Sequence, residues 1–514
     1  MSDSTVIISV FVALFAVFTF LGFYGSRWRK GDLNHLHEWA LAGRRLGAVL
    51  AFFLVGADLY TAYTFVAVPS GVFAKGSLYF FAVPYVAMTF AVALAFAPKL
   101  WKLSREKGYI TGSDFVRDAF NSRTLSILVA LTGIVAVFPY IALQIVGMQA
   151  VLTSMLAGFG NTETVQEVSL IIAFLILAAF TFTSGLRGAT LTAVFKDVLI
   201  WITVVVVIGA ALYEIGGFSH VFSNPSIKPN YVTVPSSLVP GYATLAFASA
   251  LQLYLYPHAV NGILSAESAH KLRLSTSFLS LYGVGLALLA LFGLIVYSVP
   301  SAMSFLSNFP PSSRGVLVVP ALILSTVPSW FAGVALLAIF VGGLVPAAIM
   351  AIAQANLLTR NIIKEFKPNL SAASETRIAK WASAVFKFIA LGFVFTVQST
   401  YAIQLQLFGG ILIAQLFPAL FMGLYIRWFK KEALTAGLIA GILSGLYMVL
   451  VANGFGTPKF TGLNSSLYST PFGSLYISVL SLGLNLLVTV VLSAIIPRRA
   501  PKEVAVQPAP AAQS

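Results

Sequence analysis

A chain of 514 residues that is 59% hydrophobic and only 9% charged cannot fold as a water-soluble globule, because soluble domains carry about 25% charged residues. The absence of cysteine excludes disulfides, thiolate metal sites, iron–sulfur clusters and cysteine nucleophiles. The net charge of +15 fits either a nucleic-acid surface or cationic membrane loops, and the positions of the cations distinguish the two.

Apolar segments long enough to cross the hydrocarbon, about 20 residues, recur along the whole chain. The first lacks the positive leader and the small-residue cleavage pattern of a signal peptide, so we interpret it as a span. The loops at 214–240 and 300–330 are long enough to carry a surface helix over an access path. We expect one transmembrane domain over 1–496 and a disordered Pro/Ala-rich cytoplasmic tail over 497–514. The sequence predicts an all-α polytopic protein with thirteen transmembrane helices, near 5–25, 47–70, 77–98, 125–156, 167–184, 190–213, 241–263, 275–299, 331–358, 379–398, 402–425, 432–452 and 473–496.

Lys and Arg are concentrated in alternate loops. One set of loops holds 26 of them and the opposite set holds four, which predicts an outside N-terminus and a cytoplasmic C-terminus in a cell membrane. The larger set includes Arg187 and Lys196, which are expected beside Asp197 at the cytoplasmic end of the sixth helix. Lys387 falls inside the tenth helix, where its side chain can extend to the interface. The basic charge therefore belongs to loops and not to a nucleic-acid surface.

Asp58 is the one acid of sixteen that is predicted to lie deep inside a span. A charged residue at mid-bilayer costs at least about 2.5–3.5 kcal/mol, so it indicates a functional site by default. The alternative is a neutral structural acid that bonds to a neighbouring hydroxyl. Gly56 precedes Asp58 and the hydroxyls of Tyr60, Thr61 and Thr64 follow it. This pattern favours a helix broken at the midplane, whose unwound backbone offers carbonyls to a cation and amides to an anion, over a continuous helix with a polar face.

The seventh predicted helix holds a possible counterpart in the string QLYLYPH at 252–258. Two interrupted segments in corresponding positions of two halves are the best sequence indication of a transporter site. The interruptions fall in the second and seventh helices, which are five apart. This spacing is what two inverted repeats, over about 47–213 and 241–425, require.

Four strings stand out along the chain: AGRRL at 42–46, GYIT and DF within 108–115, GLRG and KDV within 185–198, and AESAHK at 266–271. In this order and on this topology, they resemble the sodium:solute symporter family over nearly the whole chain. The resemblance implies a LeuT-like fold of two inverted five-helix repeats, helices 2–6 and 7–11, with peripheral helices around them. It also implies a symporter and not an enzyme, and the predicted spans hold no HExxH, Walker-type or Ser/His/Asp grouping.

Within that family the chain is most similar to the monocarboxylate permeases, through His37-Glu38-Trp39, the string DLYTAYT at 58–64 and the string GGLVPAAIM at 342–350. This resemblance implies a small carboxylate substrate of the lactate, pyruvate or propionate type. No arginine is predicted at mid-membrane, so the substrate carboxylate is expected to meet half-helix N-termini and hydroxyls. The candidate substrate-binding residues are Tyr60, Thr61, Thr64, Tyr140, Gln144, Tyr256 and His258, although such residues also link helices and His258 could instead relay protons or simply pack.

The resemblance assigns cation binding to the second and ninth helices. Family ligands on the second helix are backbone carbonyls, which correspond to Ala57 and Tyr60. On the ninth helix the family uses a carbonyl and two hydroxyls, and the matching positions here, Ala348 and Ala351 in the string AAIMAI, have none. A gap-free alignment gives Val345-Pro346 instead, also without hydroxyls. Sodium is a hard cation that needs several oxygen ligands, so this site is weakened under either alignment.

We therefore expect a proton–monocarboxylate symporter in which Asp58 carries the proton. Sodium coupling through the Asp58 carboxylate is also compatible with the sequence, since one charged oxygen can replace two hydroxyls. So are a sodium-coupled symporter of another solute, such as an amino acid, and an ion-uncoupled facilitator or channel. The expected partners are a small carboxylate, a coupling cation (H+ or Na+) and the bilayer, with no nucleic acid, resident cofactor or metal beyond a possible sodium ion at Ala57 and Tyr60, in a functional monomer.

Overall fold

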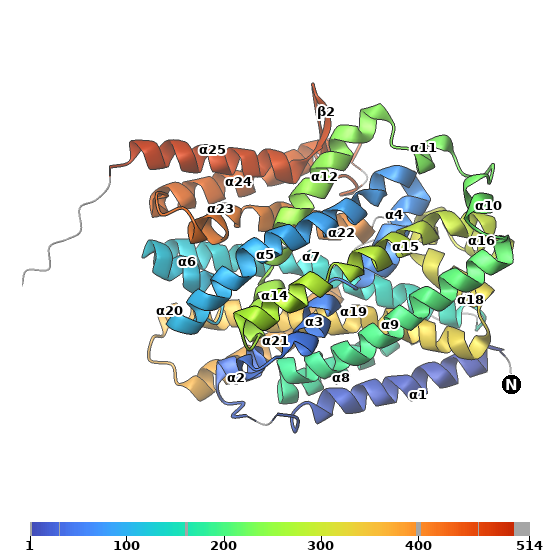
Figure 1. Ribbon diagram of the computed structural model, residues 1–514, viewed down its shortest axis with the longest axis horizontal. Coiled ribbons are helices and arrows are strands. Elements are labelled where there is room, and N and C mark those ends of the chain that lie inside the picture. Colours follow the sequence, from blue (N-terminus) through green and yellow to red (C-terminus); the bar gives the residue numbers. More distant parts are fainter. Residues whose placement is uncertain (1–2, 30, 160–162, 397–401, 461, 498–514) are drawn as a thin grey trace, which may run out of the picture.

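The computed structural model describes residues 3–29, 31–159, 163–396, 402–460 and 462–497. Most of the long helices run side by side along the longest axis of the molecule, with α1 on one edge and α24 and α25 on the opposite edge (Figure 1). The uninterrupted long helices are α1 (Asp3–Tyr24), α5 (Ala82–Lys107), α7 (Arg123–Leu156), α8 (Glu163–Ser184), α9 (Leu186–Ile215), α19 (Ser329–Leu358), α21 (Ala372–Thr396), α24 (Lys431–Ala452) and α25 (Ile477–Ile495).

Four further segments are interrupted helices. The first joins α3 (Ala48–Ala57), the π-helical turn η2 (Tyr63–Ala67) and α4 (Val68–Lys75). The others are α12 (Val239–Gln252) with η5 (Leu253–Leu255) and α13 (Pro257–Ser265); α14 (Ala269–Phe278) with α15 (Leu281–Ile295) and η6 (Val296–Ser298); and α22 (Ala402–Ala414) with α23 (Phe417–Leu420) and η9 (Met422–Leu424), which bends by 52°.

Short elements lie at the ends of the bundle. At one end, shown at the left of Figure 1, are α2, α6 and α20, and at the other end are α10, α11 and α16. The short elements are α2 (Leu36–Ala40), η1 (Ala42–Arg44), η3 (Gly76–Phe81), α6 (Gly112–Phe120), α10 (Phe218–Phe222), α11 (Pro229–Val232), η4 (Ser236–Leu238), α16 (Pro300–Ser307), α17 (Pro311–Arg314), η7 (Gly315–Leu317), α18 (Val318–Thr326), η8 (Thr359–Ile363), α20 (Lys364–Phe366) and the antiparallel strands β1 (Leu467–Thr470) and β2 (Gly473–Tyr476).

All thirteen predicted segments contain helix, but the count of thirteen full spans is not confirmed. Within the described ranges, ten helices are long and apolar enough to cross a membrane, or eleven if the bent α22–α23–η9 pair is one span. Two predicted segments are not among them: 47–70, where interruption leaves α3 shorter than the bilayer requires, and 379–398, where α21 is uninterrupted but is not one of the candidate spans. The thirteenth helix begins at Ile477 and not at 473, since 473–476 form strand β2. The end of the predicted 379–398 helix and residues 498–514 of the predicted tail lie outside the described residues.

The centre of the bundle is built on α19, whose apolar stretch is entirely buried. A helix that is hydrophobic on every side is stable only when other helices surround it, and α19 packs against α1, α7, α9, α13 and α21. By contrast, only 22% of the apolar stretch of α1 and 33% of those of α8 and α24 is buried, as expected for helices that face lipid.

The two helices with predicted midplane breaks lie against each other. The Leu46 N–H donates to the Ser265 carbonyl (3.1 Å) and the Glu267 N–H donates to the Leu46 carbonyl (2.9 Å). These bonds join the start of α3 to the end of α13, and α3 and α13 also pack together. Residues next to the two breaks can therefore contribute to one site.

Candidate functional site

The second predicted span is broken directly after Ala57, as its sequence indicates. Asp58 follows the last residue of α3, and helical structure resumes with the π-helical turn η2. Side chains satisfy two of the released amides: Gln144 Oε1 accepts from the Ala62 N–H (2.9 Å), and Thr61 Oγ1 accepts from the Tyr63 N–H (3.1 Å). These two backbone amides lie in the segment that was expected to bind an anion, but they are already hydrogen-bonded to side-chain oxygens of the protein itself.

The seventh predicted span is also broken. Tyr256 has an extended backbone (φ −60°, ψ 139°) between η5 and α13. The break has a local cause, because a residue before proline is pushed out of the helical region and proline is favoured at the first position of a new helix. Pro257 is that first position. The two interruptions that the sequence predicts are both present.

Asp58 is buried at the first break, with 3% of its surface exposed. Neither carboxyl oxygen makes a hydrogen bond with any residue that the structure describes. A structural acid bonded to a nearby hydroxyl is therefore not seen. Asp58 interacts electrostatically with Lys196, Tyr140 and Tyr254. Such an unsatisfied buried acid is costly unless a ligand or proton uses it.

Two predictions about α9 are wrong. Lys196 and Asp197 are both fully buried, so Lys196 is not a loop cation and Asp58 is not the only deeply buried acid. The reason is local: Gly185 has a positive φ of 59°, and α9 begins at Leu186, about one turn before the predicted start at 190. Arg187 pairs with Glu38 and not with Asp197.

The Lys196 ammonium lies against the first break. Its Nζ donates to the carbonyls of Tyr60 (2.6 Å) and Ala57 (3.2 Å), and it forms an ion pair with Asp197 Oδ1 (2.8 Å). The other Asp197 oxygen accepts a hydrogen bond from the Tyr282 hydroxyl (2.7 Å). The two carbonyls that the family resemblance assigns to sodium are therefore hydrogen-bonded to a lysine of the chain itself. The predicted pairing of Lys196 with Asp197 is confirmed, but sequence reasoning missed the contact of Lys196 with the two carbonyls. The available signal was a Lys-Asp pair followed directly by an apolar run.

The Tyr60 and Thr64 side chains do not face the other candidate residues. The Tyr60 ring packs on Tyr282 (ring centroids 4.3 Å apart) and Trp201 (5.5 Å), and its hydroxyl donates to the Tyr282 carbonyl (3.2 Å). The Thr64 hydroxyl donates to the Leu59 carbonyl (2.5 Å). Both side chains stabilise the break from the sides of α9, α15 and η2.

A second group of candidate residues gathers on the other side of Asp58. The rings of Tyr140, Tyr256 and His258 form a triangle with centroids 5.2–5.6 Å apart. The Tyr140 hydroxyl hydrogen-bonds with Thr61, and the Gln144 amide donates to the Tyr140 carbonyl (3.2 Å). This aromatic group joins α7 to both breaks. All seven predicted substrate-binding residues are buried, with at most 2% of their surface exposed.

Several buried polar atoms around this group make no hydrogen bond with the described part of the chain. They are both ring nitrogens of His258, the hydroxyls of Tyr63 and Tyr254, and the Asn261 amide nitrogen. Buried polar groups are nearly always paired in folded proteins, so these atoms are available to a polar ligand. Tyr63, Tyr254 and Asn261 were not among the predicted site residues.

The α19 positions that correspond to the family's sodium ligands offer no side-chain oxygen. Ala348 and Ala351 are fully buried, as are Val345 and Pro346 of the gap-free alignment. The part of the chain that the structure describes also contains no group of three His, Asp or Glu residues that could hold a metal ion.

The prediction that Lys387 reaches the membrane interface is wrong. Lys387 is fully buried, and its Nζ donates to Thr181 Oγ1 (2.7 Å) and Ser383 Oγ (3.0 Å). Two hydroxyls within reach satisfy the ammonium locally, so the side chain does not extend outward.

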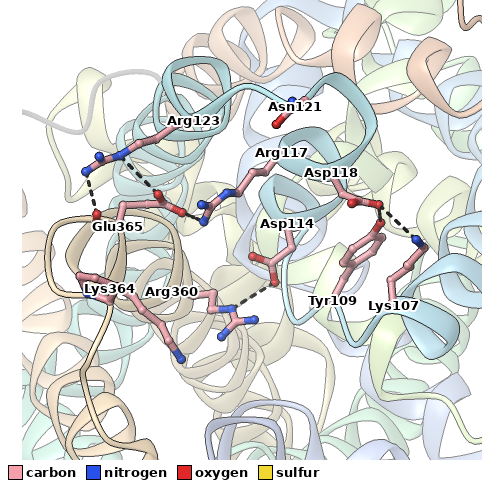
Figure 2. A pocket seen from close by; sticks show the side chains of 11 residues that line it. Lys107, Tyr109, Asp114, Arg117, Asp118, Asn121, Arg123, Arg360, Lys364 and Glu365 are labelled. Atoms are coloured by element: carbon pink, nitrogen blue, oxygen red, sulfur yellow. Dashed lines mark hydrogen bonds and ion pairs between the residues drawn. The ribbon is translucent and has the colours of Figure 1, made fainter. Parts of the chain in front are cut away.

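The cavity that Figure 2 shows lies away from these residues, at the bundle end that carries α6 and α20. It has a volume of about 650 Å³ and an ionic lining. Glu365 pairs with Arg117 and with Arg123 (3.3 Å), and Asp114 pairs with Arg360 (3.5 Å). None of the candidate site residues lines it. Its lining residues are Lys107, Tyr109, Asp114, Arg117, Asp118, Asn121, Arg123, Arg360, Lys364, Glu365 and Pro368.

A smaller cavity of about 120 Å³ lies between α4 and the α17–η7 segment. Ser70 and Gly71 of α4 line one side, and Ser312 and Gly315 line the other. Of the short helices in the loop over 300–330, where a surface helix was predicted, α16 and α17 lie largely at the surface of the protein, whereas most of η7 and α18 is buried.

Comparison with known proteins identifies relatives over nearly the whole chain. The model of the sodium:solute symporter family matches residues 39–445. The chain is 39% identical to a monocarboxylate transport permease protein of Rhizobium johnstonii over 501 residues, which cover 96% of this chain and 98% of that protein. It is 35% identical to YodF, an uncharacterized symporter of Bacillus subtilis, over 82% of this chain and 83% of that protein. A solved structure of a Na+-coupled sialic acid symporter, 15% identical, superimposes with a TM-score of 0.73 over 96% of this chain and 98% of that chain.

Proposed function

This chain belongs to the sodium:solute symporter family and has its LeuT-like fold, and from that premise we propose that it takes up a small monocarboxylate together with a proton. It is a multi-pass membrane transporter and not an enzyme. The substrate class is supported by the relative named as a monocarboxylate transport permease. The suggested substrates are lactate, pyruvate and propionate.

One observation supports the proton most directly: Asp58 lies buried at the first break and has no hydrogen-bond partner among the described residues. A charged carboxylate repels an anionic substrate, and the repulsion is strong where water is excluded. A protonated Asp58 removes that repulsion. Proton and substrate then favour each other's binding, and such reciprocal coupling is what a symporter needs.

The proposed substrate site is the aromatic group with the unpaired polar atoms around it. This site is lined by residues of α7 and of the two breaks, namely Thr61, Tyr140, Gln144, Tyr256 and His258. Hydroxyl and amide donors suit a carboxylate that meets no arginine. Tyr60 and Thr64 act instead by holding the break in shape.

The residues of α19 argue against sodium binding at the position that the family uses. Ala348 and Ala351 supply no hydroxyl, and a sodium site that loses two of its oxygens binds weakly. Sodium coupling through Asp58 is the competing proposal, supported by the family description and by the Na+-coupled structural relative.

The proposed orientation in the cell membrane places the basic end of the bundle in the cytoplasm. That end carries α2, α6 and α20 in Figure 1, and the Asp3 end of α1 lies at the opposite end. The proposal follows the positive-inside rule. In this orientation the small cavity between α4 and α17–η7 is on the outer access path, and a single copy of the chain contains the complete site.

Uptake of labelled pyruvate or lactate into proteoliposomes tests the proposal. A pH gradient alone should drive accumulation above the external concentration, and a sodium gradient at equal pH should not. Asp58→Asn should lose pH-driven accumulation, while Glu267→Gln, a change to an exposed carboxylate, should keep it. Accumulation driven by sodium alone would contradict the proton, and uptake that never exceeds equilibrium would indicate a facilitator or channel. An Asp58→Asn protein that still concentrates substrate would exclude Asp58 as the carrier.

A further inference from the structure

The Lys196 ammonium contacts three oxygen atoms in the interior of the bundle. Neither a cation in a surface loop nor a residue that only packs helices together needs such contacts. The amine is fully buried in the middle of α9, where a charged side chain is costly. We infer that the Lys196 ammonium is a tethered cation that permanently fills the position between Ala57, Tyr60 and Asp197, so that no sodium ion binds there. The inference rests on the proposed function in one respect only: it assumes that this chain is a cation-coupled transporter.

The contacts of the amine are those of a bound cation. An ammonium group has three N–H donors and no acceptor, and Lys196 has three oxygen partners: the Tyr60 carbonyl (2.6 Å), the Ala57 carbonyl (3.2 Å) and Asp197 Oδ1 (2.8 Å). Backbone carbonyls and a carboxylate are also the oxygens that a hard metal cation prefers. Since the same oxygens would serve both cations, and like charges repel strongly in a dry interior, the two exclude each other.

The surrounding residues fix the amine in place. Asp197 lies next to Lys196 in the chain and balances its charge, and the Tyr282 hydroxyl holds the second Asp197 oxygen (2.7 Å). The Tyr60 hydroxyl donates to the Tyr282 carbonyl (3.2 Å). The amine and this carboxylate thus connect α9, the first break and α15. An exchangeable ion in this position would connect the same three elements. Here the connecting cation is a side chain of the protein itself.

Lys387 provides a matched comparison within the same bundle. Its amine is equally buried but contacts the Thr181 and Ser383 hydroxyls (2.7 and 3.0 Å). No carboxylate is paired with it in the described structure. Deleting Lys387 therefore removes a buried ammonium without leaving a set of carbonyl and carboxylate oxygens that a sodium ion could use.

The test measures the thermal unfolding midpoint, Tm, of the purified full-length protein in sodium chloride and in choline chloride at equal ionic strength. Wild type should have the same Tm in both salts. Lys196→Ala should have a lower Tm in choline, and sodium should raise it by several degrees, because an ion that binds only the folded state stabilises it. Lys387→Ala should lose stability equally in both salts. Lys196→Thr, which adds a side-chain oxygen beside the vacated carbonyls, should respond to sodium at lower concentration than Lys196→Ala.

Two results would overturn the inference. One is a sodium-specific rise of Tm in the wild-type protein that persists in Asp58→Asn, since sodium held by the Asp58 carboxylate would be lost in that variant; this can be measured even if neither Lys196 variant folds. The other is a Lys196→Ala protein that responds to sodium no more than Lys387→Ala. The assay uses no substrate, so its outcome is separate from that of the uptake experiment: sodium-driven uptake would refute proton coupling, and the Tm values of Asp58→Asn and of the Lys196 variants would still decide the role of Lys196.

Discussion

The charges in the middle of the bundle and those at its α6–α20 end are held in different ways. In the middle, Lys196 and Asp197 are fully buried and have few, specific partners. At the end, Glu365 is shared by Arg117 and Arg123, whose side chains are about half exposed, and the ionic cavity of Figure 2 is open to its surroundings. Water and salt weaken the second set but not the first.

This difference separates site chemistry from bundle architecture. Buried charges cost several kcal/mol each to desolvate, so a chain keeps them only where specific partners offset that cost, as Asp197 and two backbone carbonyls do for Lys196. The charges at the end join α6 to η8 and α20, through the Arg117–Glu365 pair and the Asn361–Asp114 hydrogen bond (2.8 Å). These contacts connect residues 114 and 117 with residues 361 and 365, which are far apart in the sequence. We therefore expect substitutions to have effects that decrease from the middle to the end.

Asp197→Ala should have the largest effect on stability. It leaves the Lys196 ammonium buried without its counter-ion, and breaking such a pair costs about 3–5 kcal/mol. The measurement is the loss of Tm, followed by fluorescence-detected size-exclusion chromatography. In the double variant Asp197→Ala/Lys196→Met, part of the loss should be recovered, because neither charge remains buried. Equal losses in the single and double variants would show that the pair is not energetically coupled.

Gln144→Leu should have the next largest effect, although no charge is changed. The Ala62 N–H would lose its only described acceptor, Gln144 Oε1 (2.9 Å), and an unpaired buried amide costs about 1–3 kcal/mol. Because this bond holds the first break in shape, substrate affinity should fall together with Tm. An unchanged Tm with normal uptake would mean that the break does not depend on α7.

Glu365→Gln should cost about 1 kcal/mol, since its arginine partners are exposed to solvent. The difference in Tm from wild type should shrink at high salt, which screens exposed pairs. Asp118→Asn in the same cavity is the control: its side chain is half exposed, Lys107 is 4.0 Å away, and the asparagine oxygen can still accept the hydrogen bond from the Tyr109 hydroxyl, so a smaller change is expected. A salt-independent loss in Glu365→Gln would indicate a buried structural role instead.

Glu267→Gln should have the smallest effect. A hydrogen bond from Lys271 (2.6 Å) lowers the pKa of the Glu267 carboxyl below its usual value. A group with a lowered folded-state pKa adds stability above its unfolded pKa, and that stability is lost as the pH falls through the folded value. The small Tm difference between wild type and Glu267→Gln should therefore disappear in acid. A difference that grows as the pH falls would contradict this.

Much of the fold was predictable because the bilayer imposes it. Apolar length located all thirteen helical segments, and Gly56 and Pro257 indicated the two breaks. The predictions failed where one residue sets a boundary. Gly185 begins α9 a turn early, which moves Lys196 and Asp197 from the expected interface to the interior.

The candidate site was predictable in part. The sequence by itself determined that Asp58 is buried at a break, because an acid in an apolar run between a glycine and a series of hydroxyls has few other interpretations. It also determined that α19 lacks the two hydroxyls of the family pattern. Only the tertiary structure decided which side chain meets the Ala57 and Tyr60 carbonyls. The physical reason is that Lys196 is 139 residues away from Ala57 and 136 residues away from Tyr60 in the chain. No local sequence pattern specifies a contact between helices that are so far apart in the sequence.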